Sequence, residues 1–151
     1  MEPSTKVAVR RVLSQTPKST LVDPELTPAG VMVLMYAVDG RYRVLLNVRS
    51  DTVEEHKGEI SFPGGRMDGG DDTLLQTALR ETHEEMGVRP EDVEVLGELD
   101  DVDTRSSYRV SPFVGTIPEE YRFTPNAREV AEVIEVPLAA LRRDDAVRHE
   151  V

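Results

Sequence analysis

Three glutamates in one short segment have the side chains and the spacing of a metal site. Glu81, Glu84 and Glu85 lie at i, i+3 and i+4, so a helix places their carboxylates on one narrow face. Like charges at these spacings destabilise a helix by about 0.2–0.5 kcal/mol per pair. Hard cations such as Mg2+ and Mn2+ bind oxygen ligands of this kind. The segment therefore indicates a divalent cation that balances the three charges, with a merely solvated acidic face as the alternative.

A loop rich in glycine precedes these glutamates. Between residues 49 and 70 the sequence contains Gly58, the run Pro63-Gly64-Gly65 and the pair Gly69-Gly70. So many glycines are typical of an irregular, shaped loop. We expect this loop to offer carbonyl oxygens beside the carboxylates of the helix.

The helix that carries the glutamates is predicted over residues 74–86. Asp71 or Asp72 is predicted to cap its N-terminus, and Gly87 to end it. Its core stripe recurs at i, i+4, i+7 and i+11 and consists of Leu75, Leu79, Thr82 and Met86.

The remaining elements are predicted as strands and short helical pieces. Residues 31–38 and 42–48 flank the turn dipeptide Asp39-Gly40 and are expected to form a hairpin. The first 28 residues contain four prolines and are predicted as an irregular arm with one or two helical turns. The acidic run 100–103 is predicted as a solvated turn. Further strands are predicted over 93–99, 110–117 and 130–136, and a helix is predicted to begin over 138–143.

Length, composition and charge limit the class of protein. A chain of 151 residues with 38% hydrophobic and 31% charged side chains fits one globular domain. Its net charge of -11 repels phosphate backbones, so nucleic acid is not expected as a partner. The longest nearly apolar run, 29–38, is about half of a membrane span, and the absence of cysteine excludes thiolate zinc sites. We expect a cytoplasmic protein that does not bind membranes.

The glycine loop and the acidic helix together resemble the Nudix box. That box has a glycine, an acidic position, and then Arg-Glu, an apolar residue, any residue, Glu-Glu, any residue, Gly and an apolar residue. Residues 80–88 of this chain read RETHEEMGV and resemble its second half. Two features depart from the box: Asp71 stands where Glu is usual, and eight residues separate it from Arg80 where seven are common.

The longer spacing and an upstream motif are similar to the coenzyme A diphosphatase branch of that family. The upstream motif reads LLNVRS over 45–50 and HKGEISFPGG over 56–65. The branch usually has Leu-Arg ahead of the histidine, whereas this chain has Val53-Glu54. If that arginine contacts a substrate phosphate, Glu54 places a carboxylate there instead. Shorter similarities follow at 111–115, 129–130 and 136–138.

The resemblance implies a fold and a domain organisation. Nudix proteins have an α/β fold, an α/β/α sandwich around a mixed sheet, with the box over one sheet edge. We therefore expect a Nudix hydrolase domain over 29–151 after an N-terminal arm over 1–28. Family chains commonly add a strand and a long helix after the Pro-Leu segment, so the C-terminal end is expected to be shortened or incomplete.

The resemblance also implies a ligand set within the box. Glu81, Glu84 and Glu85 are the expected ligands of Mg2+ or Mn2+, with the carbonyl of Gly65 completing the set. Arg80 is expected to pair with a carboxylate of the box and to orient it, since a planar guanidinium suits this better than an ammonium.

A base and substrate contacts are implied as well. The base is a box glutamate or a carboxylate from a later loop, and Glu129 is our candidate in that loop. Expected substrate contacts are Arg49, His56, Phe62 and Gly64. For His56, a hydrogen bond within the loop is an equal alternative. For Phe62, a core contact is favoured over stacking on a base.

The implied activity is hydrolysis of a diphosphate bond. Metal ions neutralise the diphosphate and activate a water for attack on phosphorus. The expected substrate is a nucleoside diphosphate linked to another group, foremost coenzyme A or an acyl-CoA, which gives 3',5'-ADP and 4'-phosphopantetheine. The alternatives are a diphosphatase for ADP-ribose, dinucleotides or nucleoside triphosphates, and a module that senses a nucleotide without turnover. The sequence leaves both a monomer and a homodimer open.

Overall fold

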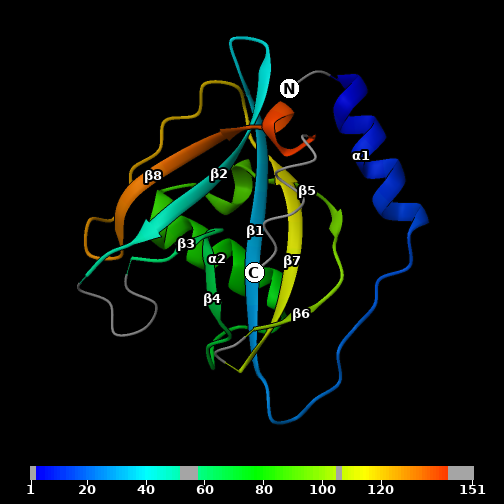
Figure 1. Ribbon diagram of the computed structural model, residues 1–151, viewed down its shortest axis with the longest axis vertical. Helices are drawn as coiled ribbons and strands as arrows, with labels where there is room; N and C mark the ends of the chain where they lie inside the picture. Colours follow the sequence, from blue (N-terminus) through cyan, green and yellow to red (C-terminus); the bar gives the residue numbers. More distant parts are fainter. Residues whose placement is uncertain (1–2, 52–57, 105–106, 143–151) are drawn as a thin grey trace.

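A mixed sheet organises the fold (Figure 1). The computed structural model describes residues 3–51, 58–104 and 107–142. Its strands are β1 (Thr27–Val38), β2 (Arg41–Arg49), β3 (Ile60–Ser61), β4 (Gly64–Arg66), β5 (Glu94–Glu98), β6 (Val102–Asp103), β7 (Tyr108–Thr116) and β8 (Val130–Pro137). Its helices are α1 (Pro3–Gln15) and α2 (Leu74–Met86), with short 3-10 helices η1 (Pro90–Asp92) and η2 (Leu138–Arg142).

The sheet combines a hairpin with a parallel pair. Its main path runs β3-β2-β1-β7-β5, while β4 pairs with β1, β6 with β7 and β8 with β2. The predicted hairpin is confirmed, because β1 and β2 are antiparallel around Asp39 and Gly40. Both turn residues have positive φ, 53° and 77°, as a tight two-residue turn requires. In contrast, β1 and β7 run parallel from Thr27 opposite Tyr108 to Met35 opposite Thr116.

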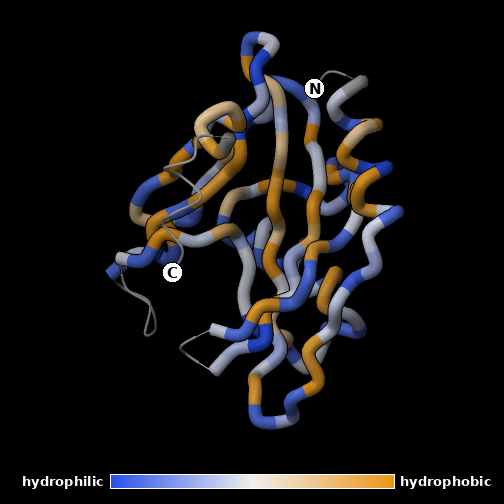
Figure 2. The backbone as a smooth tube through the Cα atoms, turned by 45° about the vertical axis from the view of Figure 1, so that its right-hand side comes forward, coloured by the Kyte–Doolittle hydropathy of each residue, from blue (hydrophilic) through white to orange (hydrophobic). Residues whose placement is uncertain are grey.

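The two long helices cover opposite faces of this sheet. Because side chains alternate along a strand, β1 supplies Met32 and Leu34 to one core cluster and Met35 to another. Helix α2 joins the first cluster, and helix α1 packs on the second through Val9 and Leu13. Figure 2 shows the hydrophobic colour concentrated along the central strands. The α/β/α sandwich around a mixed sheet is therefore confirmed.

Helix α1 is longer than the one or two turns predicted. Its 13 residues lie beside β5 (Figure 1). Leu13 comes so close to the sheet that a Cβ on Gly97 would lie 2.6 Å from the Leu13 Cβ. Lys6 and Arg10 form ion pairs with Glu94 on β5. Docking of this kind stabilises a helix that sequence preference alone leaves marginal. No helix in the described part of the chain is long and apolar enough to cross a membrane.

The ends of α2 differ in how well they were predicted. Gly87 ends the helix in the left-handed conformation at φ 73°, as expected. The cap at the other end is Thr73, whose hydroxyl accepts a hydrogen bond from the Gln76 backbone N–H at 3.1 Å. The prediction of Asp71 or Asp72 was wrong. Asp71 is engaged by a guanidinium instead, as described below.

The helix expected to begin at 138 is found there, as the short 3-10 helix η2. One further prediction needs correction. The run 100–103 is not a solvated turn, because the Asp101 side chain is completely buried. Its carboxylate accepts a hydrogen bond from the Ser111 hydroxyl at 2.6 Å and lies 2.9 Å from the Lys18 ammonium. A buried carboxylate with such partners is a structural link, which residue type alone does not reveal.

Candidate metal centre

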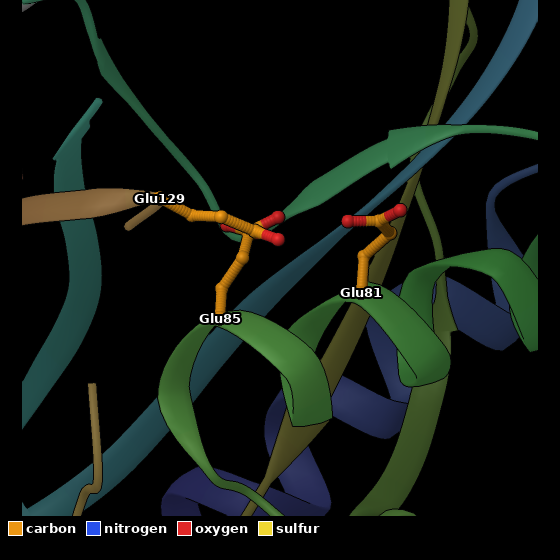
Figure 3. A group of neighbouring side chains, drawn as sticks. All are labelled: Glu81, Glu85 and Glu129. Atoms are coloured by element: carbon orange, nitrogen blue, oxygen red, sulfur yellow. The ribbon is translucent and has the colours of Figure 1, made fainter. Parts of the chain in front are cut away.

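Three carboxylates from two distant parts of the chain meet at the N-terminal side of β8. Glu81 and Glu85 stand one turn apart on α2, and Glu129 immediately precedes β8. One oxygen from each lies within 4.8 Å of the others. Figure 3 shows the carboxylates of Glu85 and Glu129 turned toward one another, with Glu81 on the same side of the helix.

Backbone hydrogen bonds fix Glu129 in this position. The Asn126 N–H donates to the Glu85 carbonyl at 2.8 Å, so the loop before β8 satisfies an end carbonyl of α2. The Glu129 N–H donates to the Asn126 carbonyl at 3.0 Å, and the Ser50 N–H donates to the Glu129 carbonyl at 2.9 Å. Glu129 is thereby tied both to the helix that carries Glu85 and to the end of β2.

Glu85 is the most buried member of the cluster. Its side chain is only 3% exposed, and its Oε1 accepts a hydrogen bond from Asn47 Nδ2 at 3.0 Å. Burial, with the neighbouring Glu81, raises the pKa of Glu85 to about 8. Burial and the charge of Glu81 also raise the pKa of Glu129. The protein alone therefore holds these charges at a cost, and a cation between them lowers that cost.

The glycine loop lies directly against the cluster. A Cβ on Gly65 would lie 2.8 Å from the Glu81 Cδ, so a side chain at this position would displace that carboxylate from where it now lies. Gly64 is constrained on its other side, since a Cβ there would lie 2.3 Å from the Gly30 carbonyl oxygen of β1. This close approach explains Gly64 by packing alone, and its contact with substrate stays a prediction.

Arg80 binds three carboxylates of the box segment. Its Nε and Nη2 donate to the two oxygens of Asp71 at 3.0 and 2.9 Å, a bidentate pair. Its Nη1 donates to Glu81 Oε1 at 2.9 Å. Glu84 lies at 3.4 Å from the same Nη1. The guanidinium holds the pKa of the Asp71 carboxyl well below its usual range, and the pairing orients Glu81.

Glu84 occupies a different place from the other two box glutamates. Its side chain is 46% exposed, and among the described residues it is not part of the group formed by Glu81, Glu85 and Glu129. The structure thus joins two of the three expected carboxylate ligands to the candidate base. The role of Glu84 as a ligand stays a prediction.

The residues expected to contact the substrate lie in different parts of the structure. Arg49 ends β2 near Glu129, where its positive charge partly offsets the rise in the pKa of that carboxyl that burial and Glu81 cause. Phe62 packs against the core cluster on the α1 side of the sheet, which fits the core contact favoured from the sequence. His56 lies outside the described residues, as does Glu54.

Asn47 is a site residue that the sequence analysis missed. It is 1% exposed on β2 and contacts Glu85. The available signal was an amide inside the otherwise apolar run of β2, because a buried polar side chain needs a partner. Nothing in the sequence identified Glu85 as that partner.

The donor set of this cluster fits a hard divalent cation. Three carboxylates offer oxygen ligands at one point, and the backbone of Gly65 lies beside them. The Arg80 guanidinium, which contacts Glu81, is also bound to Asp71. Carboxylates of this kind suit Mg2+ or Mn2+ better than softer metals.

The chain is similar to known proteins. A sequence model of the NUDIX domain matches residues 26–150. The chain is 46% identical over 95 residues to an uncharacterized Nudix hydrolase NudL of Pectobacterium atrosepticum. The aligned region covers 63% of this chain and 50% of that protein. The chain spans about half the length of the curated relatives it matches.

Solved structures share the fold. The crystal structure of RenU, a Nudix hydrolase from M. smegmatis, has a TM-score of 0.61 at 24% identity and covers 76% of this chain and 74% of that one. The NUDIX domain of Shewanella oneidensis NrtR complexed with ADP ribose has a TM-score of 0.57 at 23% identity, over 93% of this chain and 86% of that one.

Proposed function

Because the chain belongs to the Nudix family, we propose that it is a metal-dependent hydrolase of diphosphate bonds in nucleoside diphosphate derivatives. The observation that carries this proposal is the group of Glu81, Glu85 and Glu129, whose oxygens lie within 4.8 Å of one another. A module that only senses a nucleotide has no need of such a group, so hydrolysis is favoured over sensing.

The residues of the site would have different roles. Glu81, Glu85 and Glu129 would hold Mg2+ or Mn2+, with Glu84 and the Gly65 carbonyl as further expected ligands. When bound, the ion neutralises diphosphate charge and lowers the pKa of water. Arg80 keeps Glu81 oriented through its contact at 2.9 Å.

A carboxylate of the same cluster is our candidate for the base. The carboxylate of Glu129 lies beside those of Glu81 and Glu85, with one oxygen of each within 4.8 Å of the others, so it is within reach of a water that the ion would hold, as a general base must be. Glu129 also comes from a loop outside α2. It is therefore able to take a proton from water on one side of the cluster, while α2 supplies the other carboxylates.

Coenzyme A or an acyl-CoA is the substrate we propose first. The support is the resemblance of residues 45–50 and 56–65 to the coenzyme A diphosphatase motif. Water would add across the diphosphate and release 3',5'-ADP and 4'-phosphopantetheine. The carboxylate of Glu54, in place of a usual arginine, argues for a substrate without the 3'-phosphate. The NrtR domain complexed with ADP ribose supports ADP-ribose as the second candidate.

A substrate panel with product identification by mass spectrometry tests this proposal. Coenzyme A, dephospho-coenzyme A, ADP-ribose, a dinucleotide and a nucleoside triphosphate are incubated with enzyme and Mg2+ or Mn2+. Cleavage of coenzyme A at its diphosphate supports the first candidate, and repetition with Glu54→Arg tests the effect of that carboxylate. If ADP-ribose alone is turned over, the coenzyme A assignment is wrong and only the broader assignment as a diphosphatase stands. If none of the compounds is turned over, the proposal is contradicted.

From the sequence we also propose that the protein is cytoplasmic and that it can form a homodimer. The net charge of -11 is consistent with a protein that avoids nucleic acid and membrane surfaces. Sedimentation equilibrium at several protein concentrations distinguishes the monomer from the homodimer.

A further inference from the structure

A chain of two hydrogen bonds leads from the sheet to Glu85. Asn47 on β2 lies opposite Ser61 on β3 in the strand register, so their side chains share one face of the sheet. The Ser61 hydroxyl donates to Asn47 Oδ1 at 3.3 Å, and Asn47 Nδ2 donates to Glu85 Oε1 at 3.0 Å. Asn47 and Glu85 are 1% and 3% exposed.

The direction of this chain is fixed by its chemistry. An ionised carboxylate, which is the form that binds a cation, only accepts hydrogen bonds, so the Asn47 amide then presents its NH2 group to Glu85 and its oxygen to Ser61. The hydroxyl of Ser61 meets that oxygen as a donor. The two contacts together therefore hold the amide in one orientation.

The contact also leaves Glu85 free to bind a cation. A carboxylate has two oxygens with about four lone-pair sites, and Asn47 occupies one of them. A neutral donor restrains the carboxylate without neutralising it, whereas a lysine or arginine at this position would compete with the cation. Partners of metal ligands commonly have this role.

We propose that Asn47, oriented by Ser61, is a positioning residue that fixes the Glu85 carboxylate for cation binding by the Glu81, Glu85 and Glu129 cluster. This inference rests on the proposed function, because it presumes that the cluster binds a divalent cation. It adds a residue outside the box helix, and it assigns Ser61 the task of holding the amide.

Direct titration of the protein with Mn2+, followed by electron paramagnetic resonance or calorimetry, tests the proposal without turnover. Asn47→Leu keeps the branching at Cγ but removes the donor, and the Kd for Mn2+ should rise by about 10–100-fold. Thr82→Val is the matched control. Thr82 is also buried on α2, but its hydroxyl donates to the Ala78 carbonyl at 2.7 Å, so its Kd should stay within about twofold of wild type.

Ser61 provides a second test that does not depend on the folding of Asn47→Leu. Ser61→Ala removes the hydroxyl that orients the amide and should weaken Mn2+ binding, whereas Ser61→Thr retains a hydroxyl and should restore it. In a Glu85→Gln background, Asn47→Leu should have no further effect, because the group it positions is gone.

The outcomes separate the inference from the proposed function. Wild-type protein that does not bind Mn2+ contradicts the metal site itself. Wild-type protein that binds Mn2+ while Asn47→Leu binds equally well overturns only the role of Asn47. If Asn47→Leu fails to fold, wild-type affinity in Ser61→Ala overturns the proposal. A lower thermal midpoint in Asn47→Leu with an unchanged Kd assigns Asn47 a merely structural role, and likewise overturns it.

Discussion

At the scale of single residues, the box glutamates are not equivalent. Glu85 is buried against Asn47 and Glu129, whereas the Glu84 side chain is 46% exposed and lies 3.4 Å from Nη1 of Arg80. Sequence spacing placed both on one helix face and assigned them the same task. Burial distinguishes them, because it depends on what packs above the helix.

We expect Glu85→Gln and Glu84→Gln to differ in turnover. Glu85→Gln removes a carboxylate of the cluster and should lower kcat by orders of magnitude. Glu84→Gln should lower it less, because its side chain lies outside the cluster. Steady-state kinetics at saturating Mg2+ measures both. Equal losses in the two variants would show that Glu84 joins the ligands when a cation is present.

The same pair should differ in stability without metal. Glu85→Gln replaces a buried acid, whose charged form is penalised by desolvation, with a neutral side chain of similar shape. Its thermal midpoint in chelator should therefore equal or exceed that of wild type. Glu84→Gln changes an exposed ion pair and should shift the midpoint little. A marked fall in the midpoint of Glu85→Gln would indicate that the charged carboxylate stabilises the metal-free fold.

At the scale of elements, the site depends on how closely α2 approaches β1. Gly30 on β1 lies under the first turn of the helix, where a Cβ would come within 2.4 Å of the Leu74 carbonyl oxygen. That oxygen belongs to the backbone and has no freedom to move aside. The separation of helix and strand is therefore set by a residue without a side chain.

Gly30→Ala should destabilise the protein by about 1–3 kcal/mol, as overpacking does. Gly69→Ala is its matched control, since a Cβ there meets nothing within 4 Å and the substitution restricts the unfolded chain. Urea unfolding of both variants measures the difference. A Gly30→Ala variant as stable as Gly69→Ala would mean that helix and strand adjust without cost.

Local patterns predicted the elements better than the tertiary contacts. The hairpin, α2 and its Gly87 end follow from turn chemistry and periodicity, which act within a few residues. Helix α1 packs on β5 and pairs with Glu94, some 80 residues away, and no local pattern predicts such contacts. For the same reason the burial of Asp101 was missed. Glu129 was placed near the site only through the family resemblance.

At the scale of the whole molecule, Asp101 joins the N-terminal segment to the sheet. Its buried carboxylate accepts a hydrogen bond from the Leu21 backbone N–H at 3.1 Å and lies 2.9 Å from the Lys18 ammonium. From the sheet side, the Ser111 hydroxyl donates to it at 2.6 Å, and the Arg109 guanidinium lies at 3.5 Å. The Asp101 carboxylate therefore helps to anchor the segment between α1 and β1 to the sheet.

Asp101→Asn should destabilise the fold by about 3 kcal/mol near pH 7, because it removes the anion that these cations face. The adjacent Asp100→Asn is the control. Asp100 accepts a hydrogen bond from the Ser19 backbone N–H at 2.8 Å on the surface, and the asparagine oxygen retains that contact. Chemical denaturation of the two variants at pH 7 should give clearly different free energies of unfolding.

The same carboxylate predicts a dependence on pH. Although burial opposes ionisation, hydrogen bonds from Ser111 and the charge of Lys18 lower the pKa of Asp101 in the folded state. Its stabilising contribution is therefore complete above the unfolded value of about 3.9 and is lost as the pH falls through the folded pKa. The difference in stability between wild type and Asp101→Asn should shrink from pH 7 to pH 2. A constant difference over that range would contradict this assignment.

The acidity of the whole chain leads to the last prediction. The chain has a net charge of -11, so any salt screens the repulsion between its acidic groups and raises its stability somewhat. A divalent cation that binds the cluster in the native state raises the free energy of unfolding further. At 100 times its Kd, such a ligand contributes about 2.7 kcal/mol.

MgCl2 or MnCl2 should therefore raise the thermal midpoint by several degrees more than NaCl of equal ionic strength. Chelation should abolish turnover, and renewed Mg2+ or Mn2+ should restore it. In Glu85→Gln the two kinds of salt should have nearly the same effect on the midpoint, because only screening remains. Full activity after rigorous removal of metal, or an equal response of wild-type protein to both salts, would mean that the cluster functions without a cation.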